Sequence, residues 1–302
     1  FNDTIPAKEV WRVSEDGELR DPFKKLTTVF QMSEEMFFLH YGKDGCNRHV
    51  LIDECRELFG EIYEQIPELP FCNIWTAMQL SSRLPKGALF HMGVSNTRRC
   101  WNMFQLPESV ESACNVGCCG IDGCVSTLVG ASLVNPDRLC YVVVGDLTFF
   151  YDLNSLGNHH IGTNLRVMLV NNGRGTEFRL GIHHCNVFGD DADKYMAAAG
   201  HFGNKSPLLV KHYAEDLGFH YLSATTKEEF MTALSNFTNP QLSDHSMILE
   251  VFTDSKDESE ALYLMSHIQS DAKGMVRSKL KDAVRNVAGE KGINAIKKIL
   301  KK

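Results

Sequence analysis

The chain has 302 residues, of which 43% are apolar, and a formal net charge of −7 at pH 7. Such a length and composition are typical of a globular protein with one large core or two smaller ones. No apolar run approaches the roughly 20 residues that a membrane-spanning helix needs, and the first residues lack the pattern of a signal peptide. We therefore expect a cytoplasmic protein that binds neither membranes nor nucleic acid.

Two short strands are predicted near the start of the chain, at residues 9–13 and 26–30, with an Asp-Gly turn between them. From about residue 44 onward, predicted helices and strands alternate. The predicted helices lie at 50–66, at 72–84, after residue 97, between 124 and about 133, from Asp152 onward, at 207–217 and at 227–237. The predicted strands lie at 87–92, 112–116, 139–145, 165–170, 220–222 and 247–252. This alternation predicts an α/β fold with a doubly wound, mostly parallel sheet and helices on both faces.

The ten cysteines are interpreted as reduced thiols that pack as small hydrophobic groups. Apolar helix and strand patterns contain Cys55, Cys72, Cys100 and Cys140. A second set comprises Cys114, Cys118, Cys119 and Cys124. The spacing of this second set is not that of paired Cys-x-x-Cys motifs, so buried small residues are a better interpretation than a zinc site.

The most informative segment is GDLTFFYDLNSLGNHHIGTNLRVMLVNNGRG, residues 145–175. It follows the apolar run 139–144 and contains a second such run at 165–170, and both runs are typical of buried parallel strands. Asp146 and Asn172 therefore come to the same edge of the sheet. A carboxylate and an amide oxygen at that edge suit a hard cation that accompanies phosphate.

These motifs resemble the thiamine-diphosphate (ThDP) enzymes, in which a Gly-Asp at one strand end is followed by Asn-Asn at the next. The fuller set is CNVGCCGIDG at 114–123, then GDLTFFYDLNSL, then NNGRG. It is most similar to one branch of that family, the menaquinone-pathway synthases that make 2-succinyl-5-enolpyruvyl-6-hydroxy-3-cyclohexene-1-carboxylate. The resemblance is to the C-terminal, diphosphate-binding part of such enzymes.

The resemblance implies a Mg²⁺ site. Asp146 and Asn172 would ligate the ion through their side chains, and the main-chain carbonyl of Arg174 would be the third protein ligand. Oxygens of the diphosphate and a water would complete the shell that Mg²⁺ prefers. The alternative for Asp146 is a helix N-cap.

The resemblance also implies a binding site for ThDP. The turn at 120–123 leads into a helix, whose free N–H groups and dipole favour an anion such as diphosphate. In the family, an aliphatic side chain at the position of Ile121 props the cofactor in a bent conformation, and ordinary core packing is the alternative for this residue. The predicted cofactor-binding residues are Gly120, Ile121, Asp122, Gly123, Gly145, Asp146, Leu147 and Asn172.

The substrate side departs from the family pattern. Arg99 matches an arginine that binds a substrate carboxylate, since a guanidinium fork fits that group, and Phe178 matches an aromatic residue that faces the substrate. A second such arginine is replaced by Val116, and Arg174 stands where the family usually has a glycine. The replacement by Val116 argues against isochorismate as a substrate. The segment His183–Cys185 either lines the mouth of the site or has a packing or surface role.

ThDP enzymes of this kind have a pyrimidine-binding domain, a middle domain and a diphosphate-binding domain. Residues 1–43 would be the end of the middle domain and a linker, and 44–269 the domain that binds ThDP and Mg²⁺. The chain starts with Phe and opens within a strand pattern, so we expect a fragment. The resemblance implies that the activating glutamate would come from the pyrimidine domain of the same protein in a homo-oligomer. We therefore expect no catalytic residue in this chain, and no activity from it alone.

Residues 270–302 are predicted to be a basic helical extension. The segment from Asp271 onward contains ten Lys and Arg residues but only three Asp and Glu residues. Apolar residues at helical spacing, Ile293, Ile296 and Ile299, predict packing on the acidic body or on a neighbouring subunit. Binding of nucleic acid or a membrane surface by this segment is the alternative.

The predicted function is that of a ThDP- and Mg²⁺-dependent transferase or lyase, which decarboxylates a 2-oxoacid and transfers the remainder to an acceptor. Its expected partners are these small molecules, and the resemblance implies a role in menaquinone biosynthesis. One alternative is a paralogous enzyme with a different 2-oxoacid or acceptor. An alternative of another class is a non-catalytic module that keeps the cofactor fold for binding.

Overall fold

The computed structural model describes residues 7–42, 50–180, 183–195, 201, 203 and 205–268. The chain divides into two compact units, residues 1–64 and 65–302. The predicted boundary near residue 43 and the predicted extension at 270–302 fall on or next to residues outside the described ranges. The assignment of these units to family domains therefore stays a prediction.

The first unit contains the two strands predicted at its start, and they pair in parallel. Parallel pairing needs a connection longer than a tight hairpin, and residues 14–25 supply it. Trp11, Phe30, Phe37 and Tyr41 form an aromatic cluster beside the strands, with ring centroids 4.9–6.4 Å apart. The elements of this unit are β1 (Val10–Val13), β2 (Leu26–Phe30), α1 (Glu34–Tyr41) and α2 (Val50–Glu64).

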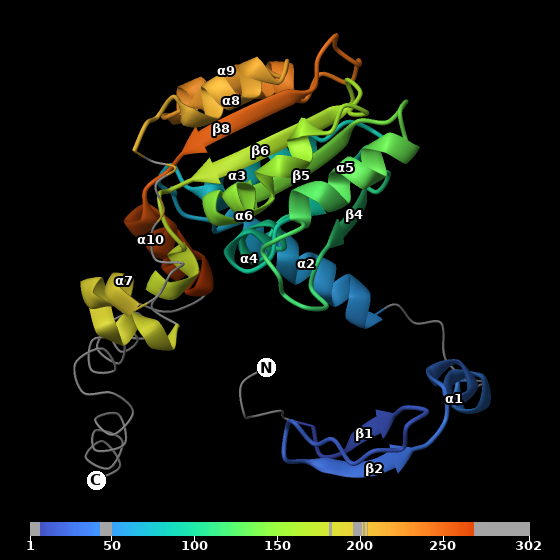
Figure 1. Cartoon of the computed structure of the whole chain (residues 1–302). Helices are drawn as coiled ribbons and strands as arrows, with labels where there is room; N and C mark the ends of the chain where they lie inside the picture. Colours follow the sequence, from blue (N-terminus) through green and yellow to red (C-terminus); the bar gives the residue numbers. More distant parts are fainter. Residues whose placement is uncertain are drawn as a thin grey trace. The chain divides into compact units, whose positions relative to one another are not determined.

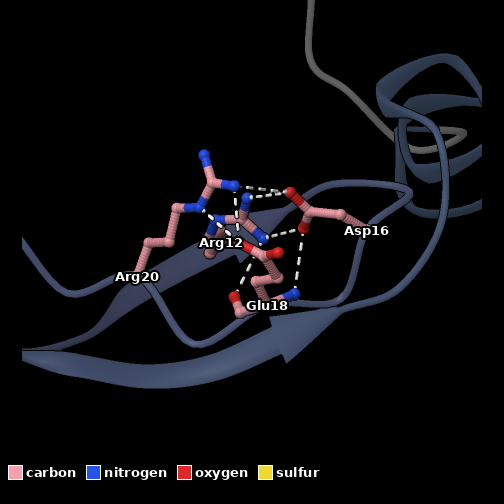
Figure 2. A network of polar contacts seen from close by, with 4 residues as sticks. All are labelled: Arg12, Asp16, Glu18 and Arg20. Carbon is pink, nitrogen blue, oxygen red and sulfur yellow. Dashed lines mark hydrogen bonds and ion pairs between the residues drawn. The ribbon is translucent and has the colours of Figure 1, made fainter.

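A charged network holds the connection between β1 and β2 (Figure 2). The Arg12 guanidinium donates two parallel hydrogen bonds to the Asp16 carboxylate, Nη1–Oδ1 at 2.6 Å and Nη2–Oδ2 at 2.8 Å. Arg20 forms ion pairs with both Asp16 and Glu18. The hydrogen bonds from Arg12 hold the pKa of Asp16 well below its usual value.

The second unit is built on a six-stranded parallel sheet (Figure 1). The strand order is β4-β3-β5-β6-β8-β7. The central strands β5 and β6 are almost continuously apolar, which is typical of parallel strands that are buried on both faces. The strands are β3 (Leu89–Met92), β4 (Glu111–Cys114), β5 (Cys140–Gly145), β6 (Leu165–Asn171), β7 (His220–Ala224) and β8 (Met247–Phe252).

Helices cover both faces of this sheet. Alternate residues of β5 enter two separate cores: Tyr141 and Val143 pack with α3, α4, α9 and α10, whereas Val142 and Val144 pack with α5, α6 and α8. The predicted doubly wound α/β fold is therefore confirmed. The α-helices of this unit are α3 (Asn73–Leu80), α4 (Asn96–Trp101), α5 (Cys124–Val134), α6 (Asp146–Asp152), α7 (Ala192–Tyr195), α8 (Leu209–Asp216), α9 (Lys227–Phe237) and α10 (Ser255–Ser266). The 3-10 helices are η1 (Ser81–Arg83), η2 (Leu153–Gly157), η3 (Thr176–Arg179) and η4 (His184–Asp191).

The chain changes direction across the sheet between β3 and β5. The connection after β3 leads outward to β4, and the next one returns to β5 on the other side of β3. Helices α4 and α5 consequently pack on opposite faces. The connections that leave the carboxyl ends of β3 and β5 run over opposite faces of the sheet, and open α/β sheets bind ligands at such a point.

Two predictions about local structure are wrong. The helix expected from Asp152 onward ends at that residue, because α6 begins directly after β5 at Asp146. The thiols of Cys55, Cys118 and Cys119 are exposed rather than buried. Cys118 and Cys119 lie in the irregular segment between β4 and α5, where no apolar face covers them.

The other cysteines agree better with the sequence pattern. Four of them, Cys72, Cys100, Cys124 and Cys140, are buried, and Cys114 is partly buried. All the described cysteines are free thiols.

Helix α10 was not predicted from the sequence. It begins where the Asp254 side chain accepts the Lys256 N–H. No helix in the described part of the chain is long and apolar enough to cross a bilayer.

Candidate functional site

A cavity of about 150 Å³ opens at the carboxyl edge of the parallel sheet. Its walls are formed where three strands end: residues 94–97 after β3, residues 145–148 from the last residue of β5 onward, and residues 172 and 174–178 after β6. Asn73 of α3 and Ile121, which precedes α5, complete the lining with Val170. The cavity therefore lies at the reversal in strand order that favours ligand binding.

Asp146 is the first residue of α6 and is only 2% exposed, although it lines this cavity. Its Oδ1 accepts the Leu147 N–H at 2.8 Å, and its Oδ2 lies 2.9 Å from His201 Nε2. His201 Nδ1 accepts the Gly203 N–H at 3.0 Å. In a neutral imidazole the other nitrogen then carries the proton, so we assign His201 Nε2 as the donor to Asp146.

Asn172 and Arg174 follow β6 and line the same cavity. The Arg174 N–H donates to Asn172 Oδ1 at 3.4 Å, and the Arg174 carbonyl accepts the Thr176 N–H at 3.0 Å. The structure thus brings together Asp146, Asn172 and Arg174, the three residues predicted to hold Mg²⁺. Across the described residues, no three His, Cys, Asp or Glu side chains gather as a metal cluster. A cation here would therefore depend on one carboxylate with amide and carbonyl oxygens.

The predicted cofactor turn reaches the cavity through Ile121, whereas Gly120, Asp122 and Gly123 do not line it. Gly123 is the N-cap of α5 and has a φ of 107°, a conformation that favours glycine. The Ser126 N–H at the start of α5 donates to the Asp152 carboxylate at 2.7 Å. One of the N–H groups expected to bind phosphate is therefore already paired. Gly145 and Leu147, from the second predicted cofactor motif, do line the cavity.

Arg99, the predicted substrate-binding arginine, forms an ion pair with Glu177. Its Nη1 and Nη2 lie 2.8 Å and 3.0 Å from the two carboxylate oxygens of Glu177. Glu177 and Phe178 both line the cavity, and the Phe178 ring packs edge-on against His183. Val116, which replaces the second family arginine, is 43% exposed.

A buried polar group supports the floor of the cavity. Glu258 of α10 is 1% exposed, and its Oε1 accepts the Asn73 N–H at 3.0 Å and the Thr253 hydroxyl at 2.8 Å. The Asn73 side-chain oxygen in turn accepts the Trp101 ring N–H at 3.0 Å. Burial raises the pKa of Glu258 to about 7. Asn73, which lines the cavity, is therefore fixed by residues of α4 and α10.

A second buried group lies under the end of β6. Glu250 of β8 accepts the Asn171 side-chain amide at 2.7 Å and the Tyr221 hydroxyl at 2.7 Å. Burial raises the pKa of Glu250 above its usual value. These bonds join β6, β7 and β8 at Asn171, the residue before Asn172.

Four residues in or around this site were not predicted from the sequence: Asn73, Glu177, His201 and Glu258. Glu177 follows the NNGRG motif within a few residues, so its proximity to the site could have been anticipated, but its pairing with Arg99 could not. His201 and Glu258 lie in segments with no recognised motif. Fold and cavity together define a doubly wound α/β protein with a cavity at the carboxyl edge of its sheet.

No family model matches this chain, but its sequence is related to those of known proteins. It is 33% identical over 263 residues to the 2-succinyl-5-enolpyruvyl-6-hydroxy-3-cyclohexene-1-carboxylate synthase of Bacteroides fragilis, a match that covers 85% of this chain and 45% of the relative. The synthase of the same name from Phocaeicola vulgatus is 32% identical over 265 residues, 85% of this chain and 44% of the relative. The chain is a homologue of these synthases along most of its own length, and it spans less than half of theirs.

Proposed function

We propose that the chain is the C-terminal, diphosphate-binding part of a ThDP- and Mg²⁺-dependent enzyme, which decarboxylates a 2-oxoacid and joins the remainder to an acceptor. The observation that carries the proposal is the position of Asp146 and Asn172, which follow adjacent central strands and line one cavity. The similarity to the 2-succinyl-5-enolpyruvyl-6-hydroxy-3-cyclohexene-1-carboxylate synthases supports a role in menaquinone biosynthesis.

The residues around the cavity fit a magnesium diphosphate. Mg²⁺ in such sites is usually held by one or two carboxylates together with phosphate oxygens, so the single carboxylate of Asp146 suffices. The hydrogen bond from His201 orients that carboxylate, as residues behind a metal ligand commonly do. Gly145 lines the cavity and has open space where a Cβ would stand, which leaves room for a ligand.

Each residue would then have a defined task. Asp146, Asn172 and the Arg174 carbonyl would hold Mg²⁺, while Ile121, Gly145 and Leu147 would contact ThDP. The remaining candidates for the diphosphate are Gly120, Asp122 and Gly123. The bound cofactor supplies the electron sink for decarboxylation, and the protein binds and orients it. Arg99 and Phe178 would face the substrate.

We further propose that the pyrimidine domain of a partner subunit completes the site in a cytoplasmic homo-oligomer. The activating glutamate would come from that domain, and the chain alone would then be inactive. A paralogous enzyme with a different 2-oxoacid or acceptor is the second candidate. Val116 favours it, because the valine removes a cation from a site that would otherwise bind a multiply anionic acceptor.

Titration of the full-length protein with ThDP tests this proposal. Binding should require Mg²⁺, and Asp146→Ala and Asn172→Ala should each weaken it by more than the roughly 10- to 100-fold that loss of a supporting residue costs. Asp216→Ala, at an exposed position at the end of α8, is the matched control and should bind normally. Unchanged ThDP affinity in a folded Asp146→Ala protein would refute the assignment. The 302-residue chain alone should bind ThDP more weakly and show no turnover.

A further inference from the structure

Arg174 is the one cationic residue that lines the cavity in the described part of the chain. The other charged lining residues there are acidic, Asp146 and Glu177. Glu177 is already neutralised by Arg99, whose Nη1 and Nη2 lie 2.8 Å and 3.0 Å from its two carboxylate oxygens. Asp146 is hydrogen-bonded to His201. Arg174 therefore brings to the cavity a positive charge that neither acidic residue neutralises.

The main chain of Arg174 is fixed, whereas its side chain is available to a ligand. The Arg174 N–H donates to Asn172 Oδ1 at 3.4 Å, and the Arg174 carbonyl accepts the Thr176 N–H at 3.0 Å. Within the described ranges, the guanidinium of Arg174 forms no ion pair. The residue is half-buried, so its charge is partly shielded from water. A guanidinium in such a place can bind a ligand carboxylate at two points without displacing a protein partner.

The wall that contains Arg174 is the substrate side of the proposed site. Residues 172 and 174–178 form this wall, and it includes Phe178, which we propose to face the substrate. The residues that we propose to contact ThDP, namely Ile121, Gly145 and Leu147, belong to other segments of the lining. An anionic group of the substrate is therefore a better ligand for Arg174 than the diphosphate of the cofactor.

The departures from the family pattern agree with this assignment. The family usually has a glycine at position 174, and it has an arginine at the position of Val116 that binds a substrate carboxylate. This chain lacks the second of these arginines and has gained one beside Asn172. Arg174 thus adds a carboxylate-binding group that the family pattern does not contain.

We propose that the side chain of Arg174 determines substrate specificity by binding the second carboxylate of a dicarboxylic 2-oxoacid. This inference rests on the proposed function and adds a substrate-binding residue to it. Binding of the ThDP diphosphate by the same guanidinium is the competing explanation. The two explanations differ in which ligand is lost when the guanidinium is removed. The main-chain carbonyl that would hold Mg²⁺ remains in every side-chain variant.

Arg174→Gln in the full-length protein tests the proposal with two 2-oxoacids of the same chain length. One is 2-oxoglutarate, which ends in a carboxylate, and the other is 2-oxopentanoate, which ends in a methyl group. The ratio of kcat/KM for 2-oxoglutarate over that for 2-oxopentanoate should fall at least about tenfold, because a charge-assisted contact is lost. Arg174→Lys keeps the charge and should lower the ratio less. An unchanged ratio in a folded Arg174→Gln protein would overturn the proposal.

Arg98→Gln is the matched control. Arg98 lies on α4 at an exposed position and does not line the cavity. The variant removes the same charge from the same protein, so it should keep the wild-type ratio. An equal fall in the ratio in Arg98→Gln and Arg174→Gln would contradict a specific contact at Arg174.

Ligand-observed NMR titration without ThDP supplies a readout that needs no turnover. Glutarate should bind wild type at least about tenfold more tightly than it binds Arg174→Gln, whereas pentanoate should bind both alike. Equal affinities of the two proteins for glutarate contradict the proposal.

ThDP titration of the same proteins keeps the hypotheses apart. Wild type and Arg174→Gln should bind ThDP alike, and a loss of ThDP affinity with unchanged glutarate binding would assign the guanidinium to the diphosphate instead. Absence of Mg²⁺-dependent ThDP binding in wild type would refute the proposed function, while the glutarate comparison would still decide the role of Arg174.

Discussion

The two sides of the cavity are built in different ways. On the deep side, Asp146 and Asn172 follow the central strands β5 and β6, and buried groups such as Glu250 and Glu258 support the adjacent backbone. On the rim side, Arg99 and Glu177 lie on short helical segments and are partly exposed. The deep side belongs to the core of the sheet, and the rim side does not.

Substitutions on the two sides of the cavity should therefore have different effects. A change on the deep side disturbs buried hydrogen bonds and close packing, so it should cost stability. A change of charge on the rim should cost little stability, because partly exposed ion pairs contribute about 1 kcal/mol or less. The departures from the family pattern at Val116 and Arg174 lie in loops rather than strands.

The largest expected effect concerns Glu258→Gln and pH. Folded Glu258 keeps its proton up to about pH 7, whereas the ordinary pKa of this group is 4.5. The folded state therefore binds more protons between these values, so the stability from this group is complete below pH 4.5 and is lost as the pH rises to 7. Over this window the free energy of unfolding of wild type should fall by roughly 3 kcal/mol more than that of the variant.

Urea denaturation at a series of pH values from 4 to 8 measures this difference. Glu228→Gln, at an exposed position on α9, is the control and should follow wild type across the range. Parallel curves for wild type and Glu258→Gln would mean that Glu258 does not hold a proton in the folded protein near neutral pH.

A smaller effect is expected for Tyr221→Phe. The change removes the hydroxyl that donates to Glu250 at 2.7 Å and leaves a buried carboxyl oxygen without that partner. The free energy of unfolding should fall by about 2 kcal/mol, the range for hydrogen bonds to charged groups. Tyr213→Phe is a matched comparison, because the Tyr213 hydroxyl donates to a neutral carbonyl, that of Leu153, also at 2.7 Å. Tyr213→Phe should lower the free energy of unfolding by only about 1 kcal/mol. Denaturation of both variants at pH 8 measures the difference. Equal losses of stability would show that Glu250 is not ionised at that pH.

The smallest effects come from two glycines at the carboxyl ends of neighbouring strands, Gly93 directly after β3 and Gly145 at the end of β5. A Cβ at Gly93 would lie 3.2 Å from the Val143 carbonyl oxygen, in the backbone of β5, so Gly93→Ala should destabilise by about 1 kcal/mol through overpacking. A Cβ at Gly145 would meet no atom within 4 Å, and the φ of −77° suits alanine. Gly145→Ala should therefore fold normally but bind ThDP more weakly. Denaturation and ThDP titration of both variants check this, and normal ThDP binding by Gly145→Ala would argue that the cofactor does not approach that position.

Much of the deep side could be read from the sequence. The apolar runs at 139–145 and 165–170 predicted β5 and β6 within about a residue, since a buried parallel strand needs apolar side chains on both faces. Polar residues directly after such runs must lie at the carboxyl edge of the sheet, and strand periodicity alone therefore places Asp146 and Asn172 on one edge. The start of α6 was missed, because a helix that follows a strand without a loop leaves no turn signal.

The side-chain contacts at the rim and around Asn73 could not be predicted from the sequence, because they depend on tertiary structure. Arg99 and Glu177 are 78 positions apart, and Asn73 and Glu258 are 185 apart, so no local pattern links them. Strand and helix periodicity repeats over a few residues and is set by backbone geometry, which is why the sequence by itself determined the sheet and its edge. Side-chain pairing depends on which loops and helices the completed sheet brings together. Only the tertiary structure could therefore decide that Glu177 occupies Arg99 and that Glu258 is buried under the cavity floor.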